Sequence, residues 1–141
     1  MLSQEFIKIL HKKMFGDVWS WAGKFRKSEK NIGVKWVTIG VELQALLNDT
    51  NYWIAQHIYP PEEIAIRFKH RLVNIHCFPN GNGRHSRIMA DIIMESIFGL
   101  GIFSWNNSNM VKPDETRKNY IDAIREGDKG NIQPLIDFAK K

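Results

Sequence analysis

A short segment from His76 to Arg87 holds the residues best suited to chemistry, in the order HCFPNGNGRHSR. Gly81 and Gly83 allow backbone conformations that other residues avoid, so that successive N–H groups can point into one concavity and bind anionic oxygens. A helix predicted to begin near Arg84 adds its own unpaired N–H groups and the positive end of its dipole. The segment is therefore predicted to be a phosphate-binding loop between two helices.

Two arginines and a histidine flank this loop. Arg84 and Arg87 lie three residues apart in one helical turn and share a face, from which they can clamp further oxygens of a polyphosphate. A neutral imidazole at His76 can accept a proton from an attacking hydroxyl near pH 7. Each feature also has a structural interpretation: His76 as a helix cap, Arg87 as an ion-pair partner of Asp91, and residues 81–83 as an ordinary turn. The combination favours the catalytic interpretation.

The same residues resemble the signature of the Fic family, His-x-Phe-x-Asp/Glu-Gly-Asn-Gly-Arg-x-x-Arg. The matching positions are His76, Phe78, Gly81, Asn82, Gly83, Arg84 and Arg87. The resemblance covers most of the chain, from about Met1 to Phe138. Within the family, the chain is most similar to the small bacterial branch called mobile mystery protein B, which is related to the Doc toxins. It implies an all-α fold, a Fic-type helical bundle with a small β-hairpin flap. It also implies transfer of AMP from ATP to a Ser, Thr or Tyr hydroxyl of a target protein.

The resemblance assigns a role to each matching residue. His76 would be the general base that deprotonates the target hydroxyl. The backbone of residues 81–83 would hold the α- and β-phosphates of ATP, and Arg84 and Arg87 would bind the outer phosphates and stabilise charge on the leaving pyrophosphate. Phe78 would anchor the loop in the core.

The chain departs from the signature at Asn80, where the family has the Asp or Glu that holds Mg²⁺. An amide oxygen can ligate a hard cation but brings no charge, so Asn80 is a weak candidate metal ligand. Two other kinds of function therefore stay open: a Doc-like protein kinase or other nucleotide or phosphoryl transferase, and a non-catalytic nucleotide- or protein-binding module. Cys77 is expected to point away from the site, with a reactive thiol beside the arginines as the alternative.

A β-hairpin is predicted over residues 24–40, because Ile32, Val34 and Trp36 alternate with small or polar residues. The resemblance makes it the target-binding flap, on which a target peptide adds as a strand that aligns its hydroxyl with His76. Its five basic side chains against one carboxylate favour an acidic target, or alternatively protect an edge strand from aggregation. Trp36 is a candidate neighbour of the adenine.

Hydrophobic periodicity predicts the helices that position the loop. They span residues 3–15, 41–57, 60–76, 84–98, 114–126 and 132–139. The whole chain, residues 1–141, is predicted to be one Fic domain.

The composition is that of an ordinary globular protein, with 43% apolar and 25% charged residues and a net charge of +5. No apolar run approaches about 18 residues, so no membrane span is predicted. The single cysteine favours a reducing, cytoplasmic compartment. Nucleic-acid binding is not expected, because no aromatic ladder or reader motif accompanies the positive charge. His70, His76 and His85 have no recognised zinc spacing.

Many Fic proteins are inhibited by a helix with the motif Ser/Thr-x-x-x-Glu-Gly/Asn, and this chain contains only near matches. Glu126-Gly127 has Asp122 at the hydroxyl position, and Thr38 to Glu42 is followed by Leu43. Inhibition is therefore expected from an antitoxin-like partner or from an upstream segment.

Overall fold

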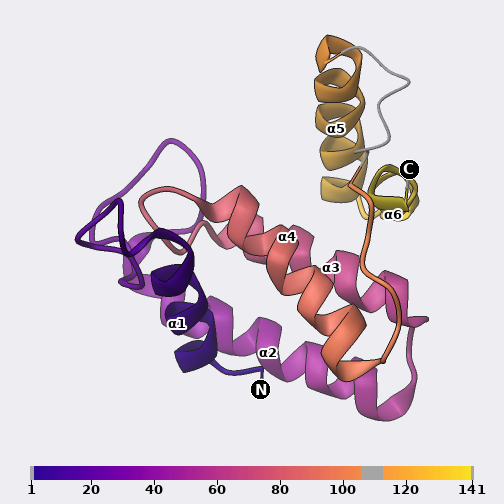
Figure 1. Cartoon of the computed structure of the whole chain (residues 1–141), viewed down its shortest axis with the longest axis horizontal. Helices are drawn as coiled ribbons and strands as arrows, with labels where there is room; N and C mark the ends of the chain where they lie inside the picture. Colours follow the sequence, from indigo (N-terminus) through magenta and orange to yellow (C-terminus); the bar gives the residue numbers. More distant parts are fainter. Residues whose placement is uncertain (1, 106–112, 141) are drawn as a thin grey trace.

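The computed structural model describes residues 2–105 and 113–140 and is built from helices (Figure 1). The main helices are α1 (Gln4–Phe15), α2 (Ile39–Gln56), α3 (Pro61–Ile75), α4 (Asn82–Ile92), α5 (Pro113–Asp128) and α6 (Gln133–Lys140). A short 3₁₀ turn, η1 (Trp36–Thr38), precedes α2, and one wide helical turn, η2 (Ile93–Ile97), extends α4. The all-α prediction is confirmed.

Helix α3 lies at the centre of the fold and contacts α2, α4 and α6, while α1 packs on α2 and α4. Phe68 and Leu72 of α3 join Leu46 of α2 and Met89 of α4 in one buried apolar cluster. Helices α5 and α6 pack against each other at the opposite end of the molecule from α1 (Figure 1). Phe78, in the turn between α3 and α4, belongs to the same cluster, so this turn is anchored in the core.

Local chemistry explains where the helices begin. The Oγ of Ser3 accepts a hydrogen bond from the N–H of Phe6 at 3.0 Å and caps α1. Pro61 begins α3, where the missing N–H has no intrahelical partner in any case, and Glu62 and Glu63 favour the positive end of the helix dipole. No helix in the described part of the chain combines the length and the apolar character needed to cross a lipid bilayer.

The predicted β-hairpin over residues 24–40 is wrong. Residues 24–35 run as an irregular loop, and the chain is helical from Trp36 onward. The N–H of Arg26 donates to the carbonyl of Cys77 at 2.9 Å, and the N–H of Val34 donates to that of Ile75 at 3.3 Å. Both ends of the loop are therefore bound to the end of α3.

The side chain of Arg26 explains why this loop replaces a hairpin. Arg26 is only 2% exposed. Its guanidinium donates to the carbonyls of His76 (2.6 Å), Ser28 (2.9 Å), Val34 and Ile75 (3.3 Å). A buried guanidinium with five donors can satisfy backbone carbonyls that strand pairing would otherwise have to satisfy. The loop is therefore organised around one buried cation.

Candidate active site

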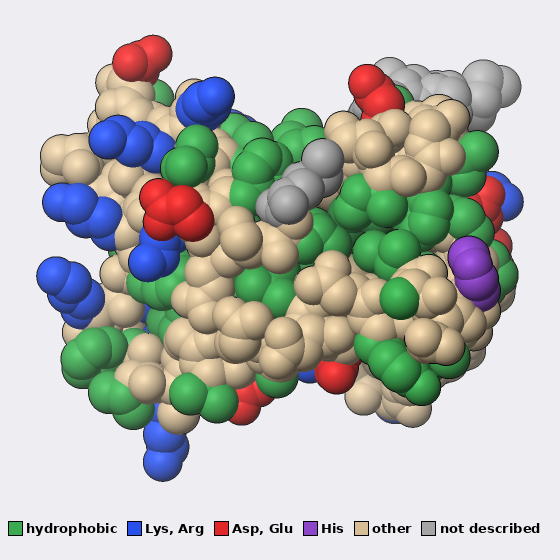
Figure 2. Space-filling model, turned by 90° about the horizontal axis from the view of Figure 1, so that it is seen from below, with side chains coloured by type: hydrophobic (Ala, Val, Ile, Leu, Met, Phe, Trp, Pro, Cys, Tyr) green, Lys and Arg blue, Asp and Glu red, His purple; other side chains and the backbone are tan. Residues whose placement is uncertain are grey.

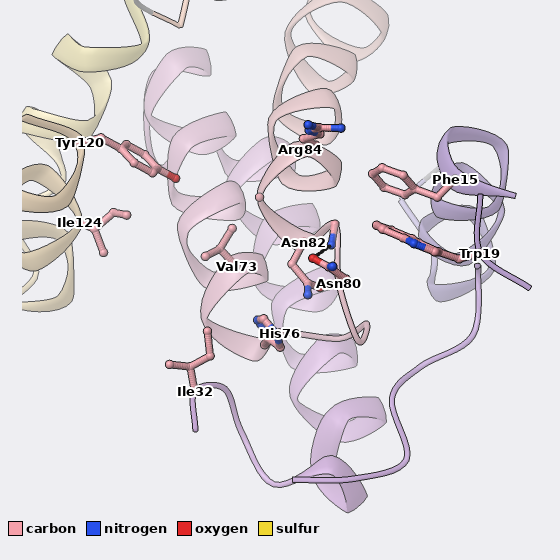
Figure 3. Close-up of a pocket in the computed structure, with 12 residues that line it drawn as sticks. Phe15, Trp19, Ile32, Val73, His76, Asn80, Asn82, Arg84, Tyr120 and Ile124 are labelled. Atoms are coloured by element: carbon pink, nitrogen blue, oxygen red, sulfur yellow. Dashed lines mark hydrogen bonds between the residues drawn. The ribbon is translucent and has the colours of Figure 1, made fainter. Parts of the chain in front are cut away.

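A cleft of about 570 Å³ opens over the turn between α3 and α4. His76 and residues 80–84 line its centre (Figure 3). Phe15 and Trp19 form one side, and Val73, Tyr120 and Ile124 form the apolar opposite side. The predicted loop thus lies at the base of a real cavity.

His76 ends α3 in a left-handed conformation, with φ of 57°, and its N–H donates to the carbonyl of Leu72 at 3.3 Å. The imidazole is half-buried and lies in the cleft (Figure 3). Burial lowers the pKa of His76 below its ordinary value, and the positive charges of Arg26 and Lys30 lower it further. The ring is therefore neutral at pH 7 and able to accept a proton.

The side chain of Asn82 closes the turn. Its Oδ1 accepts a hydrogen bond from the N–H of Phe78 at 3.0 Å, and its Nδ2 donates to the carbonyl of Phe78 at 2.8 Å. The Phe78 ring, predicted to be the anchor of the loop, is fully buried. The side chain of Asn82, a residue that also lines the cleft, therefore fixes the shape of the loop.

A buried histidine that sequence reasoning missed supports the loop from beneath. Gly23 donates its N–H to Nδ1 of His11 at 2.9 Å, so Nε2 carries the proton and donates to the carbonyl of Asn80 at 3.0 Å. The His11 ring stacks on Phe78 with 3.7 Å between ring centroids. The sequence did contain a signal for its burial, because His11 lies four residues from both Ile7 and Phe15, and all three share the buried face of α1.

Gly81 carries the sharpest steric requirement in the site. Its φ is +78°, and an added Cβ would lie 2.6 Å from the ring of Phe15. Helix α4 begins directly after it, so the N–H groups of Asn82, Gly83 and Arg84 belong to a first turn without intrahelical acceptors. Gly83 and Arg84 are exposed and line the cleft. This helix start can bind an anion.

We expect Gly81→Ala to lower the free energy of unfolding by about 1–3 kcal/mol, because it combines positive-φ strain with a clash. Gly83→Ala is the matched control, since a Cβ there meets nothing within 4 Å. Urea denaturation followed by circular dichroism measures both. Equal stability of the two variants would contradict the assigned role of Gly81.

Arg87 is not among the residues that line the cleft, but it lies close to Tyr120, which does line it. Its guanidinium is 5.3 Å from the centroid of the Tyr120 ring and 5.8 Å from that of Trp105. The alternative ion pair with Asp91 is not formed: the Asp91 carboxylate instead accepts hydrogen bonds from the Trp105 indole at 3.0 Å and from the N–H of Phe103 at 3.2 Å. Arg87 therefore places a positive charge next to an aromatic residue of the cleft wall rather than in the lining itself.

The residues do not fit a Mg²⁺ ion held by the protein. Asn80 is exposed, and its Oδ1 accepts the N–H of Gly81 at 2.8 Å. No carboxylate lines the cleft, and the described residues contain no group of three or more His, Cys, Asp or Glu side chains that suits a metal. A divalent ion here would have to be carried mainly by its own phosphate and water ligands.

Two further predictions are corrected and one is refined. Cys77 is buried, and burial raises the pKa of its thiol to about 12, so the reactive-thiol alternative is wrong. Trp36 lies outside the cleft, on a separate groove, so it is not placed to contact a base bound there. Of the three flap residues, only Ile32 lines the cleft, while Val34 packs against the core.

The family model described as Fic/DOC family matches residues 1–94. The chain belongs to the Fic/DOC family. A curated Fic relative, the protein named protein adenylyltransferase Fic of Aedes aegypti, is 24% identical over 133 residues, which cover 92% of this chain. The chain spans about a quarter of the length of the curated Fic relatives it matches.

Solved Fic structures share the fold. A Fic domain containing signalling protein from Bacteroides thetaiotaomicron superposes with a TM-score of 0.78 at 18% identity, covering 96% of this chain and 57% of that protein. The BepC effector of Bartonella tribocorum, whose structure contains bound AMPPNP, gives a TM-score of 0.69 at 17% identity, covering 99% and 73%. The helical arrangement around the cleft is thus that of Fic domains.

Proposed function

We propose that this chain is a protein adenylyltransferase that moves AMP from ATP to a Ser, Thr or Tyr hydroxyl of a target protein, with residues 1–141 as one Fic domain. The observation that carries the proposal is that the neutral imidazole of His76 and the anion-binding start of α4 line the same cleft. The activity named for the curated Fic relatives supports it, and so does the ATP analogue bound to BepC.

The proposed reaction is an in-line displacement at the α-phosphorus of ATP. His76 takes the proton of the target hydroxyl as its oxygen bonds to phosphorus, and the bond from phosphorus to pyrophosphate breaks. The N–H groups of residues 82–84 and the Arg84 guanidinium hold the phosphate oxygens, and Arg87, beside Tyr120, adds positive charge. The apolar wall of Val73, Tyr120 and Ile124 is the surface suited to the adenine ring.

The deciding experiment is incubation with ATP labelled at either the α- or the γ-phosphate, together with bacterial lysate and Mg²⁺ or Mn²⁺. The proposal expects protein-bound label from the α position only. Label from the γ position would identify the Doc-like kinase. Bound ATP without transfer of either label would identify a non-catalytic module.

The rate of AMP transfer is expected to depend on pH through His76. Because its pKa lies below the ordinary value of 6.5, transfer stays at its plateau at pH 7 and falls only as the pH drops through the lowered pKa. Measuring kcat/KM of the protein between pH 5 and 8 tests this, with circular dichroism used to show that the chain is folded at each pH. A plateau that ends above pH 7 would contradict a neutral His76.

Asn80→Asp is expected to reduce the Mg²⁺ concentration that gives half-maximal transfer by about tenfold, because a carboxylate adds the charge that the amide lacks. The measurement is a Mg²⁺ titration of AMP transfer at fixed ATP. Asn131→Asp, which makes the same change at an exposed residue outside the cleft, is the matched control. An unchanged Mg²⁺ requirement in the Asn80 variant would contradict this expectation.

We propose further, from the family resemblance, that the chain is a member of the mobile mystery protein B branch, that it is cytoplasmic, and that an antitoxin-like partner inhibits it. The missing inhibitory motif in this chain supports inhibition from outside it. Co-purification of the chain with the product of a neighbouring gene would test that expectation.

A further inference from the structure

A second groove lies between α1 and the start of α2 and has no role in the proposed reaction. It encloses about 520 Å³. Lys8, Lys24 and Lys27 line it together with Phe25 and Trp36, and it shares no lining residue with the catalytic cleft. It is therefore a separate cavity with its own chemistry.

The groove combines positive charge with an apolar floor. The Nζ of Lys8 lies 4.5 Å from the centroid of the Phe25 ring, and Trp36 is 40% exposed. No carboxylate lines the groove, and no ion pair within the described part of the chain involves its three lysines. Its lysines are therefore available to an anionic partner that also brings an apolar side chain.

The excess positive charge lies in the part of the chain that forms this groove. Residues 1–40 contain eight basic and three acidic side chains, whereas residues 41–141 contain twelve of each, so the first forty residues account for the whole net charge of +5. On the face shown in Figure 2, Lys and Arg side chains gather at the left, the end where Figure 1 places α1. A field of one sign at one end of a molecule attracts the opposite sign.

The groove is physically connected to the catalytic residue through the loop of residues 24–35. The near end of this loop lines the groove at Lys24 and Lys27, and Ile32 further along lines the cleft. Arg26, which also lines the groove, donates a hydrogen bond to the carbonyl of His76. An extended polypeptide following the loop would meet both cavities.

We propose that this groove binds an acidic stretch, carrying one apolar side chain, of the same target polypeptide whose hydroxyl reaches His76. The inference rests on the proposed function and names the target as a protein with Asp or Glu residues flanking the modified hydroxyl. Charge complementarity with the three lysines provides the attraction, and Trp36 and Phe25 receive the apolar side chain. A single exposed tryptophan is not the row of stacking platforms that single-stranded nucleic acid needs.

The test is a fluorescence-anisotropy titration, without ATP, of a labelled synthetic peptide that contains one serine, four Glu or Asp residues and one leucine. Lys24→Glu with Lys27→Glu is expected to weaken binding by about tenfold or more. Lys118→Glu with Lys129→Glu makes the same charge change on exposed lysines outside the groove and is expected to leave affinity within about twofold. Trp36→Ala is expected to weaken binding of this peptide but not of one with serine in place of leucine.

Equal weakening by the two double variants would overturn the proposal, because it would show only a general charge effect. Tighter binding of an oligothymidylate than of the peptide, sensitive to Lys24 and Lys27, would overturn it in favour of nucleic acid.

A second experiment adds α-labelled ATP and compares AMP transfer to the acidic peptide with transfer to a neutral one. AMP transfer to both peptides at equal rates would contradict the proposed role of the groove but would support the proposed function. Groove-dependent binding without transfer would support the groove and contradict the proposed function.

Discussion

His76→Ala is expected to lower the rate of AMP transfer by at least about 100-fold, the usual contribution of a general base. The imidazole faces the cleft in its neutral form, and the described residues that line the cleft include no other imidazole and no carboxylate to take the proton of the target hydroxyl. ATP affinity is expected to change little, because the phosphate contacts come from residues 82–84. Transfer measured with α-labelled ATP, alongside ATP binding by calorimetry, separates the two effects.

His57 provides a matched control for this experiment. It ends α2 in a left-handed conformation with φ of 52°, its N–H donates to the carbonyl of Trp53, and it lies outside the cleft. His57→Ala thus makes the same chemical change at the same kind of helix end and should leave transfer unchanged. Comparable activity of the two variants would remove His76 from the proposed mechanism.

Arg26→Met is expected to lower the free energy of unfolding by about 2–4 kcal/mol, because it leaves buried carbonyls without their charged donor. The carbonyl of His76 is one of them, so the loop and the proposed general base should loosen together, and transfer should fall with stability. Urea denaturation followed by tryptophan fluorescence, together with the transfer assay, measures both consequences.

Arg67→Met is the control for the stability arm. Arg67 is part-exposed and pairs with Glu63 at 2.7 Å on the same helix, a kind of ion pair that contributes about 0.3–0.5 kcal/mol. A loss at Arg26 no larger than that at Arg67 would mean that the buried guanidinium does not organise the loop.

The parts of the fold that sequence reasoning predicted depend on nearby residues. The cap at Ser3, the proline start of α3 and the turn at Gly81 each follow from interactions over a few positions. The signature loop was predictable for the same reason, since its glycines and its helix start lie within one short segment. His76 and Arg84 do line one cleft.

The failures came from contacts between distant segments. Alternation at residues 32–36 indicated a strand. Instead, the Arg26 guanidinium donates hydrogen bonds to carbonyls about fifty positions away, which holds the loop against the end of α3. His11 lies 69 positions from Asn80, which it supports, and nothing in the local pattern of α1 indicates that partner. Trp36 lines a groove together with Lys8 of α1 and lies outside the cleft. This position also depends on packing between segments that are distant in the sequence.

The pair of hydrogen bonds between Asn82 and Phe78 has a thermodynamic consequence for ligand capture. Because the protein itself closes this ring, the turn already has its receptive shape before any nucleotide arrives. The turn then loses little conformational freedom when a nucleotide binds, so more of the enthalpy of the contacts between protein and nucleotide contributes to affinity. Nucleotide capture at this turn should accordingly show a small entropic penalty.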